Sequence, residues 1–136
     1  MMNSTAPKAY IIKGDPIPLA RARHAHRRTY DDQKQLKSML RVSLESQHGD
    51  RPLYEGPLKF EATFYFGFPE KMSQAKKDKL AGKPHIFRPD ISNLQKLIED
   101  VASGILYHDD CLICISVVYK VYDHIPRTEF TITEMK

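Results

Sequence analysis

The sequence lacks any long apolar run: no stretch approaches the roughly 20 residues that span a bilayer. Its first eight residues also lack the apolar core of a signal peptide. We therefore expect a soluble, cytoplasmic protein that contacts no membrane, with residues 1–8 flexible. The chain has 136 residues, of which 41% are hydrophobic and 28% charged, and this composition excludes wholesale disorder and fits one domain.

Cysteine is scarce as well, with only Cys111 and Cys114 present. Their spacing resembles zinc and redox motifs, but zinc would need a second pair of ligands, and a redox pair normally opens a helix. Here the two cysteines stand in a β-rich run, and we expect both thiols to lie in the core.

Charge is divided unevenly along the chain. Residues 1–89 carry 17 Lys or Arg and 9 Asp or Glu, a net charge of +8, whereas residues 90–136 carry 4 and 8, a net charge of −4. The basic part suggests a polyanionic partner, and the acidic part suggests a separate site for a cation. Chance placement of charge on a solvated surface would look the same.

The periodicity predicts a single α+β domain with a mixed β-sheet flanked by helices. Strands are expected over residues 9–13, 58–66, 111–122 (a central strand, because both faces are apolar) and 128–132. Helices are expected from a cap at Asp31 or Asp32 to about Gln47, over 74–81 after Ser73, and over 91–103.

Carboxylates bracket the expected helix over 91–103. Asp90 precedes the helix, and Asp109 and Asp110 precede the next strand. If the link between them runs back over the helix, both ends can meet near one edge of the sheet. Clustered carboxylates need a cation between them, and hard oxygen ligands favour Mg²⁺ or Mn²⁺. Lys96, one turn into the helix, could then meet a phosphate.

Each of these residues also has an ordinary explanation. An Asp before a helix suits the helix dipole, an Asp-Asp pair suits a turn, and Lys96 is spaced for a surface ion pair with Asp100. Ser92 and Gln95 fit a capping box with Ser92 at the N-cap. The spacing alone therefore leaves the metal site open.

The same residues resemble the core signature of the RusA family of Holliday junction resolvases. The resemblance rests on Arg88-Pro-Asp90-Ile-Ser92-Asn93-Leu-Gln-Lys96, Glu99-Asp100-Val-Ala-Ser-Gly104 and Tyr107-His-Asp109-Asp110. The opening Gly14-Asp-Pro16 to Arg21-Ala-Arg23 and the closing strand are also similar, so the resemblance covers about residues 9–135.

This resemblance implies a homodimeric bacterial endonuclease and suggests a prophage origin. The enzyme would nick two opposed strands of four-way DNA junctions with Mg²⁺, with Mn²⁺ as a substitute and no small-molecule substrate. Asp90 and Asp110 match its metal ligands, Asp109 a further ligand or an orienting group, and Lys96 its lysine. Ser92 departs from the pattern, which has a second Asp there. A serine hydroxyl can hold a metal or its water but adds no negative charge.

The basic residues would contact DNA phosphates without reading sequence. The expected DNA-binding residues are Arg21, Arg23, Arg27, Arg28, Lys71, Lys76, Lys77, Lys79, Arg88 and Asn93. The lysines could equally form the solvated face of a helix.

The main alternative is a non-catalytic protein that binds DNA junctions and whose metal site is impaired by Ser92. Another metal nuclease of the Pro-Asp…(Asp/Glu)-x-Lys type is disfavoured, because no such second motif follows on a strand. A plain dimeric scaffold would leave the Asp-Lys-Asp arrangement unexplained.

Overall fold

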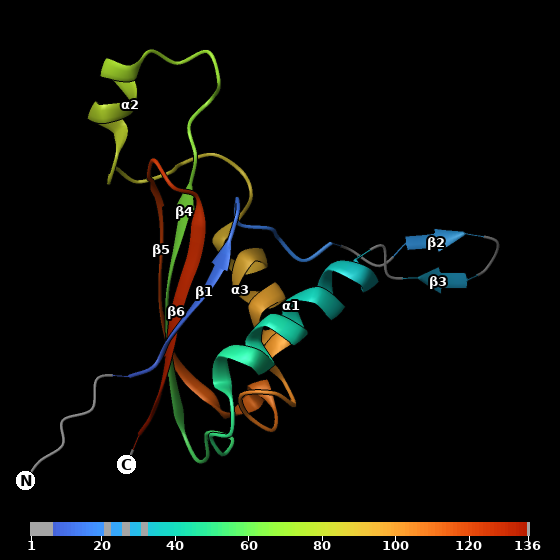
Figure 1. Cartoon of the computed structure of the whole chain (residues 1–136). Helices are drawn as coiled ribbons and strands as arrows, with labels where there is room; N and C mark the ends of the chain where they lie inside the picture. The colour runs from blue at the N-terminus through green and yellow to red at the C-terminus, as the bar shows by residue number, and fades with distance from the viewer. Residues whose placement is uncertain (1–6, 21–22, 26–27, 31–32, 136) are drawn as a thin grey trace, which may run out of the picture.

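The computed structural model describes residues 7–20, 23–25, 28–30 and 33–135 (Figure 1), and for 23–25 and 28–30 only the backbone. The expected flexibility of residues 1–6 and the predicted caps Asp31 and Asp32 lie outside the described residues, as do Arg21 and Arg27.

A four-stranded mixed sheet forms the centre of a single α+β domain, as the sequence predicted. Its strands lie in the order β1 (Ala9–Lys13), β6 (Arg127–Glu134), β4 (Leu58–Phe66) and β5 (Ile113–Tyr122). β6 runs antiparallel to both β1 and β4, whereas β5 runs parallel to β4. A parallel neighbour requires a crossover connection, and α2 and α3 are part of that crossover.

The alternating pattern of β4 builds the core. Every second residue from Leu58 to Phe66 is buried and the residues between them are only half-buried, as the period of two predicts. Phe60 of β4 and Tyr10 of β1 both pack on Phe130 of β6, which lies between them. Their ring centroids are 5.6 and 5.2 Å from the ring centroid of Phe130. Burial of these rings on one face therefore fixes which face the helices must cover.

Two helices cover that face (Figure 1): α1 (Lys34–His48) and α3 (Ile91–Ala102). The stripe predicted for α3 is confirmed, since Leu94, Leu97, Ile98 and Val101 are all buried. α1 contributes Leu44 and His48, and the buried His48 ring lies 2.7 Å from the Tyr10 hydroxyl. The N-cap of α1 is Gln33, whose side chain bonds to the backbone of Pro18 and Ala20.

A short helix, a pair of short strands and a 3₁₀ turn lie outside the four-stranded sheet and the two helices that cover it. α2 (Gln74–Leu80) begins as expected after Ser73, whose hydroxyl accepts a hydrogen bond from the Lys76 N–H at 3.3 Å. The basic segment of residues 21–30, called the basic arm below, includes the antiparallel strands β2 (Arg23–Ala25) and β3 (Arg28–Tyr30). A 3₁₀ turn, η1 (Asp110–Leu112), precedes β5. No helix among the described residues is long and apolar enough to cross a membrane.

Two predictions about the region around β5 were wrong. β5 is one of the two outer strands of the sheet and not a central one, and Cys111 and Cys114 are exposed free thiols and not core residues. Within the part of the chain that the structure describes, no helix covers one face of the sheet, and Ile115 and Tyr119 are 39% and 57% exposed there. An apolar run cannot by itself distinguish a central strand from an outer strand of a sheet with one open face.

The predicted capping box was also wrong. The N-cap of α3 is Asp90, with no side-chain capping bond, so Ser92 lies inside the first turn. The Gln95 amide does not reach back to the cap, because it donates to Glu99 at 2.9 Å and to Ser116 of β5 at 2.8 Å. The bond to Ser116 ties α3 to the outer strand.

We expect Phe60→Ala to lower the free energy of unfolding by about 3–5 kcal/mol, because it leaves a cavity among buried rings. Phe87→Ala removes the same group from a side chain that is 65% exposed and should change stability by about 0.5 kcal/mol or less. Urea denaturation of both variants checks this. Equal decreases in stability would contradict the assignment of the core.

Candidate active site

Asp90 is exposed at the N-terminus of α3, and a fixed loop presents it. The Lys120 ammonium of β5 donates to the carbonyls of Phe87 and Pro89 at 2.6 and 2.7 Å. The His85 N–H also donates to the Lys120 carbonyl at 3.0 Å. The loop before Asp90 is therefore bound to the end of β5 by both the side chain and the backbone of Lys120.

Asp109 and Asp110 lie beyond the other end of α3. The Tyr107 hydroxyl donates to the Glu99 carbonyl at 3.1 Å, which packs this return segment against the last turn of the helix. The Cys111 N–H donates to Asp109 at 3.0 Å. Both carboxylates are exposed.

These two neighbouring carboxyl groups differ in acidity. The Cys111 N–H, followed by a hydrogen bond with Asp110, holds the pKa of Asp109 below its ordinary value. Desolvation raises the pKa of Asp110, and the hydrogen bond and charge of Asp109 and the charge of Asp100 raise it further. Asp109 is thus the stronger acid of the pair, and a cation near Asp110 would favour its ionised form.

One chain does not bring Asp90 together with Asp109 and Asp110. α3 runs antiparallel to β5, since Pro89 contacts Lys120 whereas Gln95 contacts Ser116, further back along the strand. Asp110 is close enough to Asp100, in the last turn of α3, for that charge to act on its pKa. At 1.5 Å per residue, α3 separates Asp90 from this end by about 15 Å.

That separation is too large for a shared ion, because Mg²⁺ binds its oxygen ligands at about 2.0–2.1 Å. Ser92, exposed in the first turn, accompanies Asp90 and not the Asp109–Asp110 pair. Among the described residues, no group of three or more His, Cys, Asp or Glu side chains could hold a metal. The predicted ligands of a single chain therefore do not fit one Mg²⁺ ion.

The remaining predicted catalytic residue, Lys96, is exposed halfway along α3. The alternative role that the spacing allowed, an ion pair with Asp100, is not what the structure shows, because Asp100 binds two cations of α1. Lys37 lies 2.9 Å from Asp100 and Arg41 lies 3.6 Å from it. Since α1 crosses α3 here, Asp100 is partly neutralised and Lys96 is left facing outward.

Most of the predicted DNA-binding residues that can be placed gather at the Asp90 end of the sheet. Lys71, Lys76 and Lys79 are exposed on and before α2, Lys77 is half-buried, and Arg88 is exposed two residues before Asp90. Asn93 accepts a hydrogen bond through its backbone from the Leu19 N–H at 2.9 Å. This bond places the segment that leads into the basic arm beside the start of α3.

For the arm itself, Arg23 and Arg28 lie on β2 and β3 with only their backbone described, and Arg21 and Arg27 lie outside the described residues. The structure therefore does not locate the guanidinium groups of the arm.

Sequence reasoning missed Lys120 and the pairing of Lys37 with Asp100. A lysine within the apolar run of β5 was a usable signal, because a cation in such a strand needs oxygen partners. Lys37 gave no comparable signal, since its position on α1 suits a solvated side chain equally well, yet it is 8% exposed.

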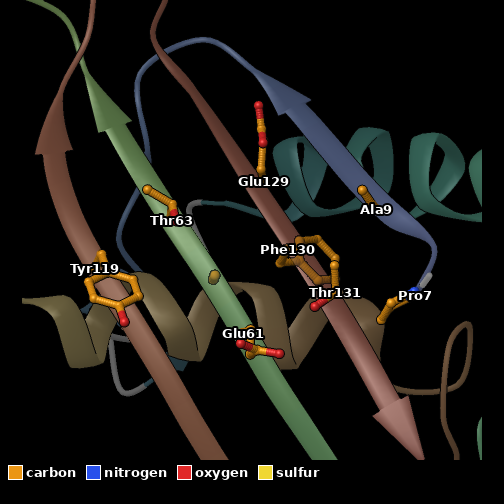
Figure 2. A pocket seen from close by; sticks show the side chains of 9 residues that line it. Pro7, Ala9, Glu61, Thr63, Tyr119, Glu129, Phe130 and Thr131 are labelled. Carbon is orange, nitrogen blue, oxygen red and sulfur yellow. The ribbon is translucent and has the colours of Figure 1, made fainter. Parts of the chain in front are cut away.

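The open face of the sheet carries none of the candidate catalytic and DNA-binding residues whose side chains are described. Figure 2 shows a hollow there, lined by Glu61 and Thr63 of β4, Tyr119 of β5 and Glu129 of β6, among others. Both carboxylates are paired with cations, Glu61 with Lys59 at 3.7 Å and Glu129 with Arg127, so these cations are not free to bind phosphate there.

The fold and these side chains define a small α+β protein with exposed carboxylates at both ends of one helix and lysines concentrated at one of them, as suits an enzyme that acts on a polyanion. A sequence model of the family described as "Endodeoxyribonuclease RusA" matches residues 13–133. The chain therefore belongs to the RusA family, whose members are nucleases and generally depend on a divalent metal.

A relative in Bacillus subtilis (strain 168) is 26% identical over 136 residues, which cover 93% of this chain and 95% of the relative. It bears the description "Uncharacterized protein YqaN" and so adds no activity. Its similarity extends over nearly the whole of both chains, as expected of proteins with the same arrangement of elements.

We expect Asp109→Asn to lower the pKa of Asp110, because it removes a neighbouring negative charge and alters the hydrogen bond that favours protonated Asp110. Carbon-detected NMR titration of the metal-free protein measures this pKa. Asp78→Asn is the control, since Asp78 instead lies 3.2 Å from His124. An unchanged or higher Asp110 pKa in Asp109→Asn would contradict the coupling.

Proposed function

We propose that this protein is a Mg²⁺-dependent endonuclease that resolves four-way DNA junctions by paired nicks, with Mn²⁺ as a substitute ion. Membership of the RusA family carries the proposal. Asp90 supports it, because it is exposed at the end of a loop that Lys120 binds and that follows the lysines of α2 and includes Arg88.

The separation of the carboxylates leads us to propose a homodimer in which each site takes residues from both copies. β5 offers a suitable interface because it is an outer strand of the sheet and Asp110 directly precedes it. Hydrogen bonds of 2.7–3.0 Å join residues 82–85 to Lys120 and Tyr122. This segment therefore covers the outer edge of β5 near the C-terminal end of the strand. Towards the start of the strand, Cys114, Ile115 and Ser116 are exposed. An uncovered edge with apolar side chains favours pairing with another strand.

A two-fold axis through this free part of β5 would pair the strand with its copy in antiparallel fashion. The start of one β5 would then lie near the end of the other. Since Asp110 precedes the start and Asp90 is bound to the end through Lys120, the pairing would bring Asp90 and Ser92 of one copy towards Asp109 and Asp110 of the other. Oxygen ligands of this kind suit Mg²⁺ and Mn²⁺.

The chain's own cations would act on the DNA. Lys96 projects from the same helix as Asp90 and would lie against the phosphate that is cut, where removing such a group typically costs about 10²–10³ in rate. The lysines of α2 would hold the flanking backbone without reading sequence. Two-fold symmetry would present two such surfaces to the two opposed strands of a junction.

We expect Asp90→Asn and Asp110→Asn each to reduce junction cleavage in Mg²⁺ by at least about 10² while junction binding is kept or improved, because a negative charge near phosphate is removed. Gel assays of cleavage and binding measure the two effects. Glu61→Gln, which changes a carboxylate on the open face of the sheet, should cleave as wild type does. Normal cleavage by both variants would contradict the assigned site, and wild-type binding without cleavage in either metal would favour the junction-binding alternative.

For the lysines, we expect Lys76→Gln with Lys79→Gln to weaken junction binding and to flatten its salt dependence by about 0.9 in logarithmic slope for each phosphate that the variant no longer neutralises. Lys13→Gln with Lys59→Gln removes the same charge from the open face of the sheet. This control should leave junction affinity and its salt dependence unchanged. Binding isotherms over a range of salt concentrations measure the slope. Equal slopes for the two double variants would contradict a phosphate role for α2.

A further inference from the structure

We propose that Ile86 and Phe87 form an apolar wedge that enters the base stack of bound DNA at the branch point of a junction. This inference rests on the proposed function and adds to it the residues that distort the DNA. Ile86 is 81% exposed and Phe87 is 65% exposed, and they stand four and three residues before Asp90.

Apolar side chains this exposed need an explanation when they stand together beside a candidate active site. Other exposed apolar side chains, Met39 and Val42 of α1 among them, are surrounded by residues without a proposed role. Ile86 and Phe87 differ because the loop that carries them leads directly into the helix of Asp90.

The loop is held firmly on both sides of the two side chains. Before them, the His85 ring stacks on Phe66 with centroids 4.0 Å apart, and the His85 N–H bonds to β5. Burial, followed by the charge of Lys120, lowers the pKa of His85, which keeps the stacked ring neutral. After them, Lys120 binds the carbonyls of Phe87 and Pro89.

This anchoring matters for binding energy. Ordering a loose loop on DNA would oppose association, whereas a loop that is already fixed avoids most of that cost. Proteins that kink DNA insert apolar side chains of this type between base steps, and unstacking costs a few kcal/mol per step. In the open form that a junction takes without divalent metal, the arms do not stack on one another at the branch point, so unstacking costs less there than within an arm.

The charge around the wedge selects DNA over other occupants. Lys83 and Arg88 flank it in sequence and are exposed, and α2 with its lysines precedes it. The Lys83 backbone carbonyl also accepts a hydrogen bond from the Tyr122 N–H, which fixes this residue beside the end of β5. Apolar tips within a rim of cations match the bases and phosphates of nucleic acid.

The test uses the full-length protein and a four-way junction that carries 2-aminopurine next to the crossover, without divalent metal so that no strand is cut. Unstacking raises the fluorescence of this base. Wild type should raise it severalfold at saturation. Phe87→Ala with Ile86→Ala should abolish most of this rise while its junction affinity changes less than about tenfold, because phosphate contacts carry most of the affinity.

Two variants serve as controls. Val42→Ala shortens a side chain with the same 65% exposure on α1 and should behave as wild type. Phe87→Leu keeps an apolar tip and should restore the fluorescence rise when Ile86 is intact. Both controls are compared at saturating protein, so that a difference in affinity does not enter the signal.

The outcomes separate the wedge from the proposed function. A wild type that binds and cleaves junctions without raising the fluorescence would overturn the wedge alone, as would a full rise in the double alanine variant. A double variant that keeps the rise but shifts to a smaller species in sedimentation would assign the two side chains to contacts between copies and overturn the wedge. A wild type that neither binds nor cleaves junctions would overturn the proposed function itself.

Discussion

The packing of α3 against the sheet is the constraint on which the rest of the structure depends. Leu94, Leu97, Ile98 and Val101 hold the helix on the rings of the core, and Gln95 ties it to β5. Because α3 lies antiparallel to β5, its start is bound to the end of the strand and its end lies towards the start. The position of every candidate catalytic side chain follows from this one arrangement.

The arrangement separates two kinds of surface. Near the start of α3 lie Asp90, the fixed loop and the lysines of α2, which together suit contact with phosphate. Near its end lie Asp109 and Asp110, beside an Asp100 that α1 has partly neutralised. The two ends of α3 thus differ in their surrounding charge, and the proposed dimer would join the Asp109–Asp110 end of one copy to the Asp90 end of the other.

Much of the fold could be predicted from the sequence because local patterns determine it. The alternation of β4, the apolar stripe of α3 and the cap at Ser73 each depend on a few neighbouring residues, and all three were confirmed. The position of β5 could not be predicted, since an apolar run does not show whether another strand lies beside it. The exposed cysteines follow from the same misplacement.

The candidate site was predictable as a set of residues but not as a geometry. Resemblance to the RusA family identified Asp90, Lys96 and Asp110, and the family is confirmed, whereas their roles stay predictions. The expectation that both ends of the helix meet within one chain assumed that the link after Gly104 runs back along α3. Instead, the Gly104 N–H bonds to the Tyr107 carbonyl at 2.8 Å, which turns the chain at the far end of the helix.

Subunit mixing tests the shared site most directly. Asp90→Asn and Asp110→Asn, each inactive alone, are refolded together and assayed on a four-way junction with Mg²⁺. If each site takes Asp90 from one copy and Asp110 from the other, mixed dimers contain one intact site, and the mixture should regain nicking at about a quarter of the wild-type level. A mixture that shows mixed dimers in native mass spectrometry and yet remains as inactive as its components would contradict the shared site.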